Sequence, residues 1–272
     1  EDRFEEIHLM STIKLLDGTD WAVEELLQHM LDDDFYYGYL GQAALSSSSC
    51  KLINQSPKSY NAIVKYAKAS EETAALTTGK LIHTMVLEPH EFDNRFTVVD
   101  TSSKSTKIWK EAVSNKGKGV SALTTKEYDD SMKVVDALLR NEIVKRHLKH
   151  SKFEVPAIGN VLGLPFRAKA DILREDAIID LKTTSEINGF RYSALKYGYP
   201  AQVFIYCQLF NIPFESFIFI AVDKGSKDIG IFTVSEQFYE EGRQLVSKAV
   251  KTYIDFFING EDLDNYVLTG EL

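Results

Sequence analysis

Two short segments of this sequence each place an acid and a lysine two residues apart. FRAKADIL contains Lys169 and Asp171, and AIIDLKTT contains Asp180 and Lys182. Both segments alternate as strands with one buried face do, so the acid and the lysine of each segment share a face. The opposite face is expected to belong to the core and carries Ala170, Ile172, Ile179 and Leu181. We therefore expect one face of these strands to carry the chemistry of the protein.

The connection between the two strands predicts how the acids meet. An even-numbered turn centred on the Glu-Asp of REDA would place Asp171 opposite Asp180 and Lys169 opposite Lys182. Directly opposed side chains have Cβ atoms roughly 4.5–5.5 Å apart, and like charges at that separation destabilise the pair. A divalent cation such as Mg²⁺ binds through one or two carboxylates, water and phosphate oxygens, so it would compensate this repulsion. Lys182 could then neutralise the site, position an attacking water or help to deprotonate it.

The same hairpin has a second interpretation. It could lie on the surface, where Lys169 and Lys182 would balance Asp171 and Asp180 as exposed ion pairs of little energetic value. The hairpin alone does not separate this alternative from a metal site.

A helix after the hairpin carries Gln202 and Tyr206, four residues apart in YGYPAQVFIYCQLFNIP. Pro200 suits the first turn of this helix, and its end is expected before Pro213. Residues four apart lie on one face of a helix, so the amide and the phenol can act together. For an isolated pair, a buried tyrosine hydroxyl bonded to the glutamine amide would be the simpler interpretation.

The whole chain is long enough to position such a site on a substantial core. It has 272 residues, 44% of them hydrophobic, and a formal net charge of −9. This charge argues against a protein coated with basic nucleic-acid-binding surface, but it leaves room for a local basic region. Two distant cysteines, Cys50 and Cys207, indicate neither a disulfide framework nor a zinc site. With no secretory signal pattern and no membrane-spanning run, we expect a soluble cytoplasmic protein that makes no contact with membranes.

The pattern of the chain predicts an α/β fold in which helices flank a mixed central sheet. Helices are expected near 45–66, 70–88, 125–150 and 236–257. The third of these is expected to begin with a Thr124–Glu127 capping box. It ends in a cluster of basic residues, which either suits the C-terminus of a helix or contacts phosphate. Strands are expected between 152 and 184 and between 217 and 234. Residues 1–44 are interpreted as an irregular N-terminal arm, of which 1–9 are a remnant of recombinant expression, and residues 45–272 as one domain.

In their order along the chain, FRAKAD, DLK and QVFIY resemble the three motifs of the RecB-like branch of the PD-(D/E)XK nucleases. LINQSPKSY and TGKLIHTMVLEPHEF resemble the N-terminal motifs of the RecE-type (exonuclease VIII) group. The resemblance runs from about Leu45 to about Phe257 and implies a restriction-endonuclease-like core. One departure is the absence of the usual glycine at the start of LPFRAKAD.

The resemblance also implies roles for particular residues. It places a metal site at His83, Asp171, Asp180 and the backbone carbonyl of Leu181, and it makes Lys182 the catalytic lysine. Gln202 and Tyr206 match the helix that lines the site and helps to place the DNA strand. Glu154, on the preceding strand, could reach the metal through water, although a structural or exposed role is the simpler expectation.

RecE-type enzymes degrade one strand of linear duplex DNA from the 5′ end. They release 5′-mononucleotides, leave a 3′ overhang for a single-strand annealing protein in phage-type homologous recombination, and enclose DNA in a homotetrameric ring. The resemblance therefore implies a Mg²⁺-dependent exonuclease, with Mn²⁺ as a substitute, in a bacterial or phage-infected cell. A ring needs basic residues only in its channel, and five cations are candidates for DNA contact: Lys51, Lys58, Arg167, Lys169 and Lys196.

Two alternatives remain at this stage. One is a RecB-like endonuclease or single-strand nuclease, although the iron–sulfur members of that group need a cysteine cluster that two distant cysteines do not provide. The other is a DNA-end-binding module without catalysis, against which the retention of Asp171, Asp180 and Lys182 argues.

Overall fold

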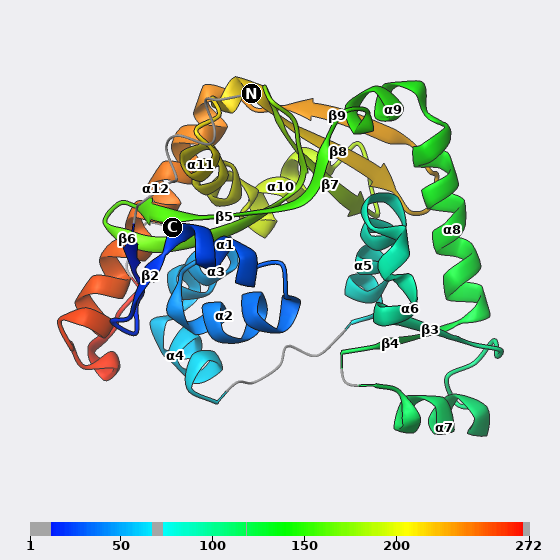
Figure 1. Cartoon of the computed structure of the whole chain (residues 1–272), viewed down its shortest axis with the longest axis horizontal. Coiled ribbons are helices and arrows are strands. Elements are labelled where there is room, and N and C mark those ends of the chain that lie inside the picture. Colours follow the sequence, from blue (N-terminus) through cyan, green and yellow to red (C-terminus); the bar gives the residue numbers. More distant parts are fainter. Residues whose placement is uncertain (1–11, 67–72, 118, 269–272) are drawn as a thin grey trace.

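A five-stranded mixed sheet forms the centre of the protein (Figure 1). The computed structural model describes residues 12–66, 73–117 and 119–268. Strand β7 pairs in parallel with β8, and the other neighbours are antiparallel. The strands follow one another across the sheet as β5 (Lys152–Val161), β6 (Leu164–Leu173), β7 (Ile178–Thr184), β8 (Phe217–Asp223) and β9 (Ile229–Thr233). The predicted mixed sheet is confirmed.

Helices cover both faces of this sheet because its strands alternate between two cores. In β8, Phe217 and Phe219 pack on one side and Ile220 and Val222 on the other. The first side is covered by α3 (Ser47–Gln55), α4 (Pro57–Tyr66), α10 (Phe190–Tyr197), α11 (Tyr199–Phe210) and α12 (Glu236–Tyr253). The second side is covered by α5 (Ala74–Leu87), α8 (Thr125–Arg140) and α9 (Glu142–Leu148). The predicted α/β class is confirmed.

A small lobe is attached to α5. It contains η2 (Pro89–Glu91), α6 (Phe92–Arg95) and the parallel strands β3 (Phe96–Val99) and β4 (Ser121–Thr124), which are connected through α7 (Lys107–Asn115). Leu81 of α5, Phe96 and Leu123 form its small core. The lobe is therefore fixed to the helix that carries His83.

The helix boundaries agree in part with the sequence. The capping box of Thr124 and Glu127 is confirmed at the start of α8. The single long helix expected to 150 is wrong, because the Asn141 side chain caps a new helix, α9, by accepting from the N–H groups of Ile143 and Val144. Thr73 caps α5, whereas the cap expected at Ser70 lies outside the described residues.

The N-terminal region is folded, so the expectation of an irregular arm is wrong. It contains β1 (Thr12–Lys14), β2 (Asp20–Ala22), α1 (Val23–His29), the π-helical turn η1 (Phe35–Tyr39) and α2 (Leu40–Ala43). Leu26, Met30 and Leu40 are buried in a core that includes Ile158 of β5. Helically spaced apolar residues among the acids supply this core. The domain boundary at residue 45 stays a prediction, and the suggested remnant at 1–9 lies outside the described residues.

The chain ends beyond α12 with the π-helical turn η4 (Ile254–Ile258) and the short η5 (Leu263–Asn265), and η3 (Phe214–Ser216) leads into β8. None of the described helices is long and apolar enough to cross a membrane.

Candidate active site

The hairpin of β6 and β7 has the predicted register. Ile172 pairs with Ile179 and Leu173 with Ile178, which directs Asp171 toward Asp180. The ladder ends at this point, and the Asp171 carboxylate accepts a hydrogen bond from the backbone N–H of Leu181 at 2.8 Å. The side chain thus takes the place of the backbone acceptor that a continued ladder would provide.

The divergence of the strands also corrects one expectation. Ala170 was expected to share a core with Ile172, but Ala170 packs on the α11 side and Ile172 on the α5 side. The alternation of β6 is therefore interrupted between these two residues, and their side chains point to opposite faces of the sheet. The neighbouring strand is distorted at the same level, where Glu154 has a φ of 50°. A positive φ is unfavourable for a residue with a side chain and occurs where the surrounding structure imposes it.

Three side chains at this level form a potential metal-binding group among the described residues. Nitrogen or oxygen atoms of His83, Glu154 and Asp171 all lie within 4.8 Å of one another, and His83 Nδ1 is 3.5 Å from Asp171 Oδ2. Glu154 stands between the pairs Phe153–Ile172 and Val155–Ala170, so it lies opposite Asp171. Two carboxylates and one imidazole are a suitable donor set for a divalent cation.

The electrostatics of the group favour binding of a cation. Burial, together with the charges of Asp171 and Glu88, raises the pKa of Glu154 to about 8. Burial lowers the pKa of His83 even though Asp171 raises it, so the imidazole is neutral and has a lone pair available. The charges that raise the pKa of Glu154 are those that a bound divalent cation would offset.

Asp180 and Lys182 form a buried pair next to this group. Their side chains are 1% and 18% exposed, and Lys182 Nζ is 2.6 Å from Asp180 Oδ2. Asp180 Oδ1 accepts a hydrogen bond from Gln202 Nε2 at 2.5 Å. The alternative of a surface hairpin with exposed ion pairs is therefore wrong for this pair. The ligand role expected for Asp180 stays a prediction, because its oxygens are engaged by Lys182 and Gln202 and it is not part of the three-residue group.

Burial and mutual attraction act in opposite directions on this pair. Burial raises the pKa of Asp180 to about 7, although Lys182 and the hydrogen bond from Gln202 lower it. Burial lowers the pKa of Lys182, but Asp180 and Asp171 outweigh this effect and raise it above the usual value. Lys182 is consequently a cation at neutral pH. Its ammonium also lies 4.9 Å from the centre of the Tyr199 ring.

Helix α11 places both residues of the Gln-x-x-x-Tyr motif at the site. The Gln202 amide reaches Asp180, and the Tyr206 hydroxyl donates to the backbone carbonyl of Lys169 at 3.0 Å. Helix α11 packs closely against α12 at Gly242, because a Cβ at that position would lie 2.0 Å from the Pro200 carbonyl oxygen. The helix is thus fixed against both α12 and β6.

The expected opposition of Lys169 and Lys182 is wrong. Lys169 Nζ lies 2.7 Å from Asp33 Oδ1, which belongs to the N-terminal region. Asp33 also faces Arg95 at 3.5 Å, and Arg95 binds Glu88 at 2.6 Å. The strands separate beyond Ile172, so Lys169 and Lys182 form ion pairs with different acids, Asp33 and Asp180. Neither Asp33 nor Arg95 carried a sequence signal that pointed to this position.

The five candidate DNA-contacting cations divide into three kinds. Lys51 and Lys196 have their ammonium groups 5.3 and 5.9 Å from the centre of the Tyr197 ring. Lys58 is paired with Asp264 at 2.8 Å, and Lys169 with Asp33. Arg167 is 7% exposed and lies 4.4 Å from the Tyr36 ring centre, with no described hydrogen-bond partner for its Nε. DNA contact by all five stays a prediction.

Glu154 is the residue whose role the sequence underrated. Its alternation with Phe153 and Val155, together with the tight turn at Leu162 and Gly163, is the signal that could have placed it opposite Asp171.

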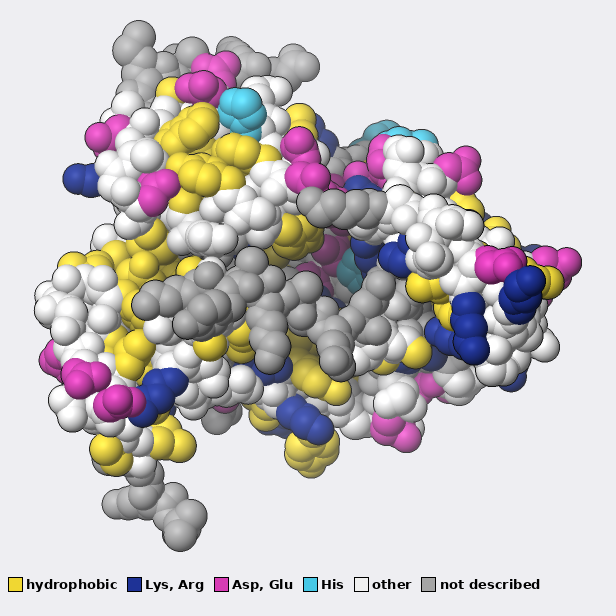
Figure 2. Space-filling view, turned by 90° about the horizontal axis from the view of Figure 1, so that it is seen from below, with side chains coloured by type: hydrophobic (Ala, Val, Ile, Leu, Met, Phe, Trp, Pro, Cys, Tyr) yellow, Lys and Arg dark blue, Asp and Glu magenta, His cyan; other side chains and the backbone are white. Residues whose placement is uncertain are grey.

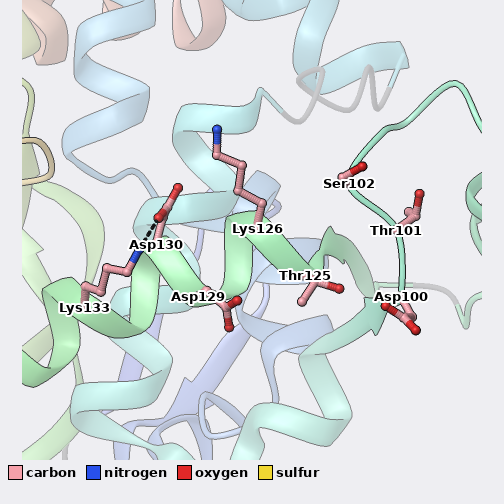
Figure 3. Close-up of a pocket in the computed structure, with 8 residues that line it drawn as sticks. All are labelled: Asp100, Thr101, Ser102, Thr125, Lys126, Asp129, Asp130 and Lys133. Atoms are coloured by element: carbon pink, nitrogen blue, oxygen red, sulfur yellow. Dashed lines mark hydrogen bonds and ion pairs between the residues drawn. The ribbon is translucent and has the colours of Figure 1, made fainter.

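The open hollow shown in Figure 3 is a separate feature. It lies where β3 leads toward α7 and α8 begins, and contains none of the residues described above. Three acids and two lysines line it, and one of the lysines, Lys133, is paired with Asp130, so acidic groups predominate there.

Comparison with known proteins places these observations in a family context. Residues 46–262 match the model of a family described as "PDDEXK-like domain of unknown function (DUF3799)". No curated protein matches the chain in sequence.

Two solved structures are similar to the chain. The crystal structure of a "Putative exonuclease" from Eubacterium rectale aligns with a TM-score of 0.64 at 16% identity, covering 89% of this chain and 95% of that one. A "phage related exonuclease" from Haemophilus somnus 129PT aligns with a TM-score of 0.35 at 16% identity, covering 81% of this chain and 98% of that one. The first similarity shows that the fold is shared.

Proposed function

Because the chain belongs to the PDDEXK-like family DUF3799, we propose that it is a divalent-metal-dependent nuclease that hydrolyses phosphodiester bonds of DNA. The observation that carries this proposal is the buried Asp180–Lys182 pair beside the group of His83, Glu154 and Asp171. Buried charges are unfavourable unless they are paired or bind a ligand. The predicted motif residues occupy adjacent strands and helices around this group, as a shared catalytic site requires.

The residues of the site suit distinct roles in hydrolysis. His83, Glu154 and Asp171 would hold the cation, and Asp180 would join them as the family resemblance implies. A bound divalent cation polarises the scissile phosphate and lowers the pKa of a coordinated water. We take the cation to be Mg²⁺, with Mn²⁺ as a substitute, because oxygen donors predominate.

Lys182 acts in this scheme as a cation. Since Asp180 and Asp171 raise its pKa, its ammonium donates hydrogen bonds and stabilises negative charge on the phosphate or the attacking water. Gln202 fixes the orientation of Asp180, and Tyr206 ties α11 to β6 through the carbonyl of Lys169. These two residues position the acid and the strand and do not transfer protons.

Charge is distributed along the chain in a way that suits a DNA substrate. Residues 101–126 contain six lysines and one acid, although the whole chain has a net charge of −9. Figure 2 shows a hollow that contains Asp, Glu and His side chains, with Lys and Arg side chains gathered toward the right-hand end of the same face. Local positive charge within an acidic protein can bind phosphates without coating the surface.

We further propose the RecE-type activity, a 5′-to-3′ exonuclease that acts on linear duplex ends to give 5′-mononucleotides and a 3′ overhang for recombination. The resemblance of LINQSPKSY and TGKLIHTMVLEPHEF to that group supports it, as does the shared fold with the Eubacterium rectale protein. A ring-shaped homotetramer, an annealing partner and a cytoplasmic location belong to the same proposal.

One assay tests the proposal directly. End-labelled linear duplex, with and without a 5′ phosphate, is incubated with Mg²⁺ or Mn²⁺ beside a covalently closed circle, using wild-type protein, Asp180→Ala and the surface control Asp136→Asn. We expect the wild type and the control to release 5′-mononucleotides from linear DNA only, and Asp180→Ala to be inactive. Equal cleavage of circles would indicate the endonuclease alternative. Binding of ends without hydrolysis in either metal would indicate the binding module and refute the nuclease.

A further inference from the structure

A row of tyrosine rings runs from Lys182 to the protein surface. The Tyr199 ring lies 4.9 Å from Lys182 Nζ, and the Tyr197 ring centre lies 6.1 Å from that of Tyr199 at an interplanar angle of 32°. Gly198 separates the two tyrosines with a φ of 79°, which ends α10 and lets α11 begin at once. This left-handed conformation favours glycine, and the reversal brings both rings together.

The outer end of the row is open to solvent. Tyr197 is 51% exposed, and Tyr192 of the same helix is 77% exposed. The two residues are five apart and lie on different sides of α10, so only the Tyr197 ring continues the row, and about half of its surface is open to a ligand. Figure 1 shows α10 next to α11, the helix that carries Gln202.

Positive charge surrounds the exposed ring. Lys51 of α3 and Lys196 of α10 place their ammonium groups 5.3 and 5.9 Å from the centre of Tyr197. A Cβ on Gly198 would lie 3.9 Å from the Cδ of Lys51, so the Lys51 side chain lies against this junction. Within the described residues, neither lysine forms an ion pair with an acid. Both charges are therefore available to an anionic ligand.

A flat apolar face flanked by cations fits the chemistry of a nucleotide. Each unpaired base offers a face for stacking and is joined to a phosphate, whereas the bases within a duplex already stack on their neighbours. An acidic peptide would use the two lysines but has no regular counterpart for the ring. The row leads to Lys182, the residue that we place beside the scissile phosphate, so a strand on this path would approach the site.

We propose that Tyr197 is a stacking platform for an unpaired base of the DNA strand, and that Lys51 and Lys196 contact its phosphates. This inference rests on the proposed function and adds the position of a separated single strand on the α10 surface. Tyr197 is a positioning residue, and stacking of one base on an aromatic ring corresponds to a change of about 5-fold to about 150-fold in Kd on removal of the ring.

The test is binding of a short single strand with a 2-aminopurine near one end, in EDTA so that no hydrolysis occurs. Tyr197→Ala is expected to weaken binding by at least about fivefold and to remove the stacking-dependent quenching of 2-aminopurine. Tyr197→Phe keeps the ring and should bind within about twofold of the wild type. Lys51→Gln should lower the slope of log Kobs against log salt by about 0.7, the value for one phosphate contact on a single strand. The surface control Lys248→Gln, on α12, should change neither Kd nor quenching.

Several outcomes would overturn the inference. They are equal binding by Tyr197→Ala and Tyr197→Phe, unchanged quenching, and an equal loss of affinity for blunt duplex. Binding of polyglutamate that competes with the strand and depends on the ring would also overturn it, in favour of an acidic peptide. Hydrolysis of linear DNA by the wild type is measured in parallel. Active wild type with ring-independent binding refutes only the platform, whereas ring-dependent binding without hydrolysis refutes only the nuclease.

Discussion

Replacing Glu154 with glutamine should have opposite effects on stability with and without a divalent cation. Burial, Asp171 and Glu88 raise the pKa of Glu154 from 4.5 to about 8. Because the pKa in the folded state is raised, the stability that this group contributes is complete below about pH 4.5 and is lost as the pH rises through about 8. The variant keeps the shape of the side chain and removes this pH dependence.

The raised pKa sets the size of the effect. At 1.36 kcal/mol per pKa unit, the change from 4.5 to about 8 corresponds to roughly 5 kcal/mol at high pH. Relaxation of the neighbouring carboxylates absorbs part of this, so we expect Glu154→Gln to gain about 2 kcal/mol over the wild type at pH 9 in EDTA. At pH 4 the two proteins should differ little. Burial lowers the pKa of His83, so its contribution to the stability of the folded state increases as the pH rises. This contribution is the same in both proteins and cancels when their stabilities are compared.

Addition of a cation should reverse the order. A ligand at 100 times its Kd stabilises the folded state by about 2.7 kcal/mol, and loss of one of the three ligands should remove most of this gain. The assay is urea denaturation at pH 4, 7 and 9, in EDTA and in Mn²⁺ or Mg²⁺. Glu175→Gln, in the exposed turn between β6 and β7, serves as the matched control. The reasoning fails if Glu154→Gln is no more stable than the wild type at pH 9 in EDTA, or if the cation stabilises both proteins equally.

Three further perturbations test the structure. Lys182→Met should cost about 3–5 kcal/mol of unfolding free energy at pH 9 and clearly less at pH 5, where Asp180 can become neutral; a pH-independent loss in urea denaturation would contradict this. Gly242→Ala should cost at least about 2 kcal/mol, because its Cβ would meet the Pro200 carbonyl, and a thermal midpoint equal to that of the wild type would be inconsistent with the packing. Asp33→Asn removes the ion-pair partner of Lys169, whereas Arg95 stays paired with Glu88, and it should steepen the salt dependence of duplex binding in EDTA by about one unit in the log–log slope, measured by fluorescence anisotropy; an unchanged slope would argue against phosphate contact by Lys169.

The elements that the sequence predicted well are those whose signals are local. A short turn determined the register of β6 and β7, and hence the approach of Asp171 to Asp180. The Thr124–Glu127 capping box marked the start of α8, because both partners lie within one helical turn. Four-residue spacing placed Gln202 and Tyr206 on one face of α11. Each of these patterns is completed by residues that are close in the chain.

Contacts between segments that are distant in the chain could not be predicted from the sequence. Asp33 pairs with Lys169, which is 136 positions away in the chain. Asp33 belongs to the N-terminal region, whose acidic composition had led to the prediction of an irregular arm. Its apolar residues needed Ile158 of β5 to complete a core. The approach of α10 to α3, which brings Lys51 to Tyr197, likewise depends on how two helices pack.

The sequence by itself determined the chemistry available to this protein: two acids, a lysine, a histidine and a Gln-x-x-x-Tyr helix in an order typical of PD-(D/E)XK nucleases. Only the tertiary structure decided which atoms meet. It distorted β5 at Glu154 and β6 at Asp171, added the Glu154 carboxylate to His83 and Asp171, and enclosed Asp180 with Lys182 and Gln202. The physical reason is that alternation along a strand specifies a face only while the strand stays regular, whereas the site lies where the ladder of β6 and β7 ends.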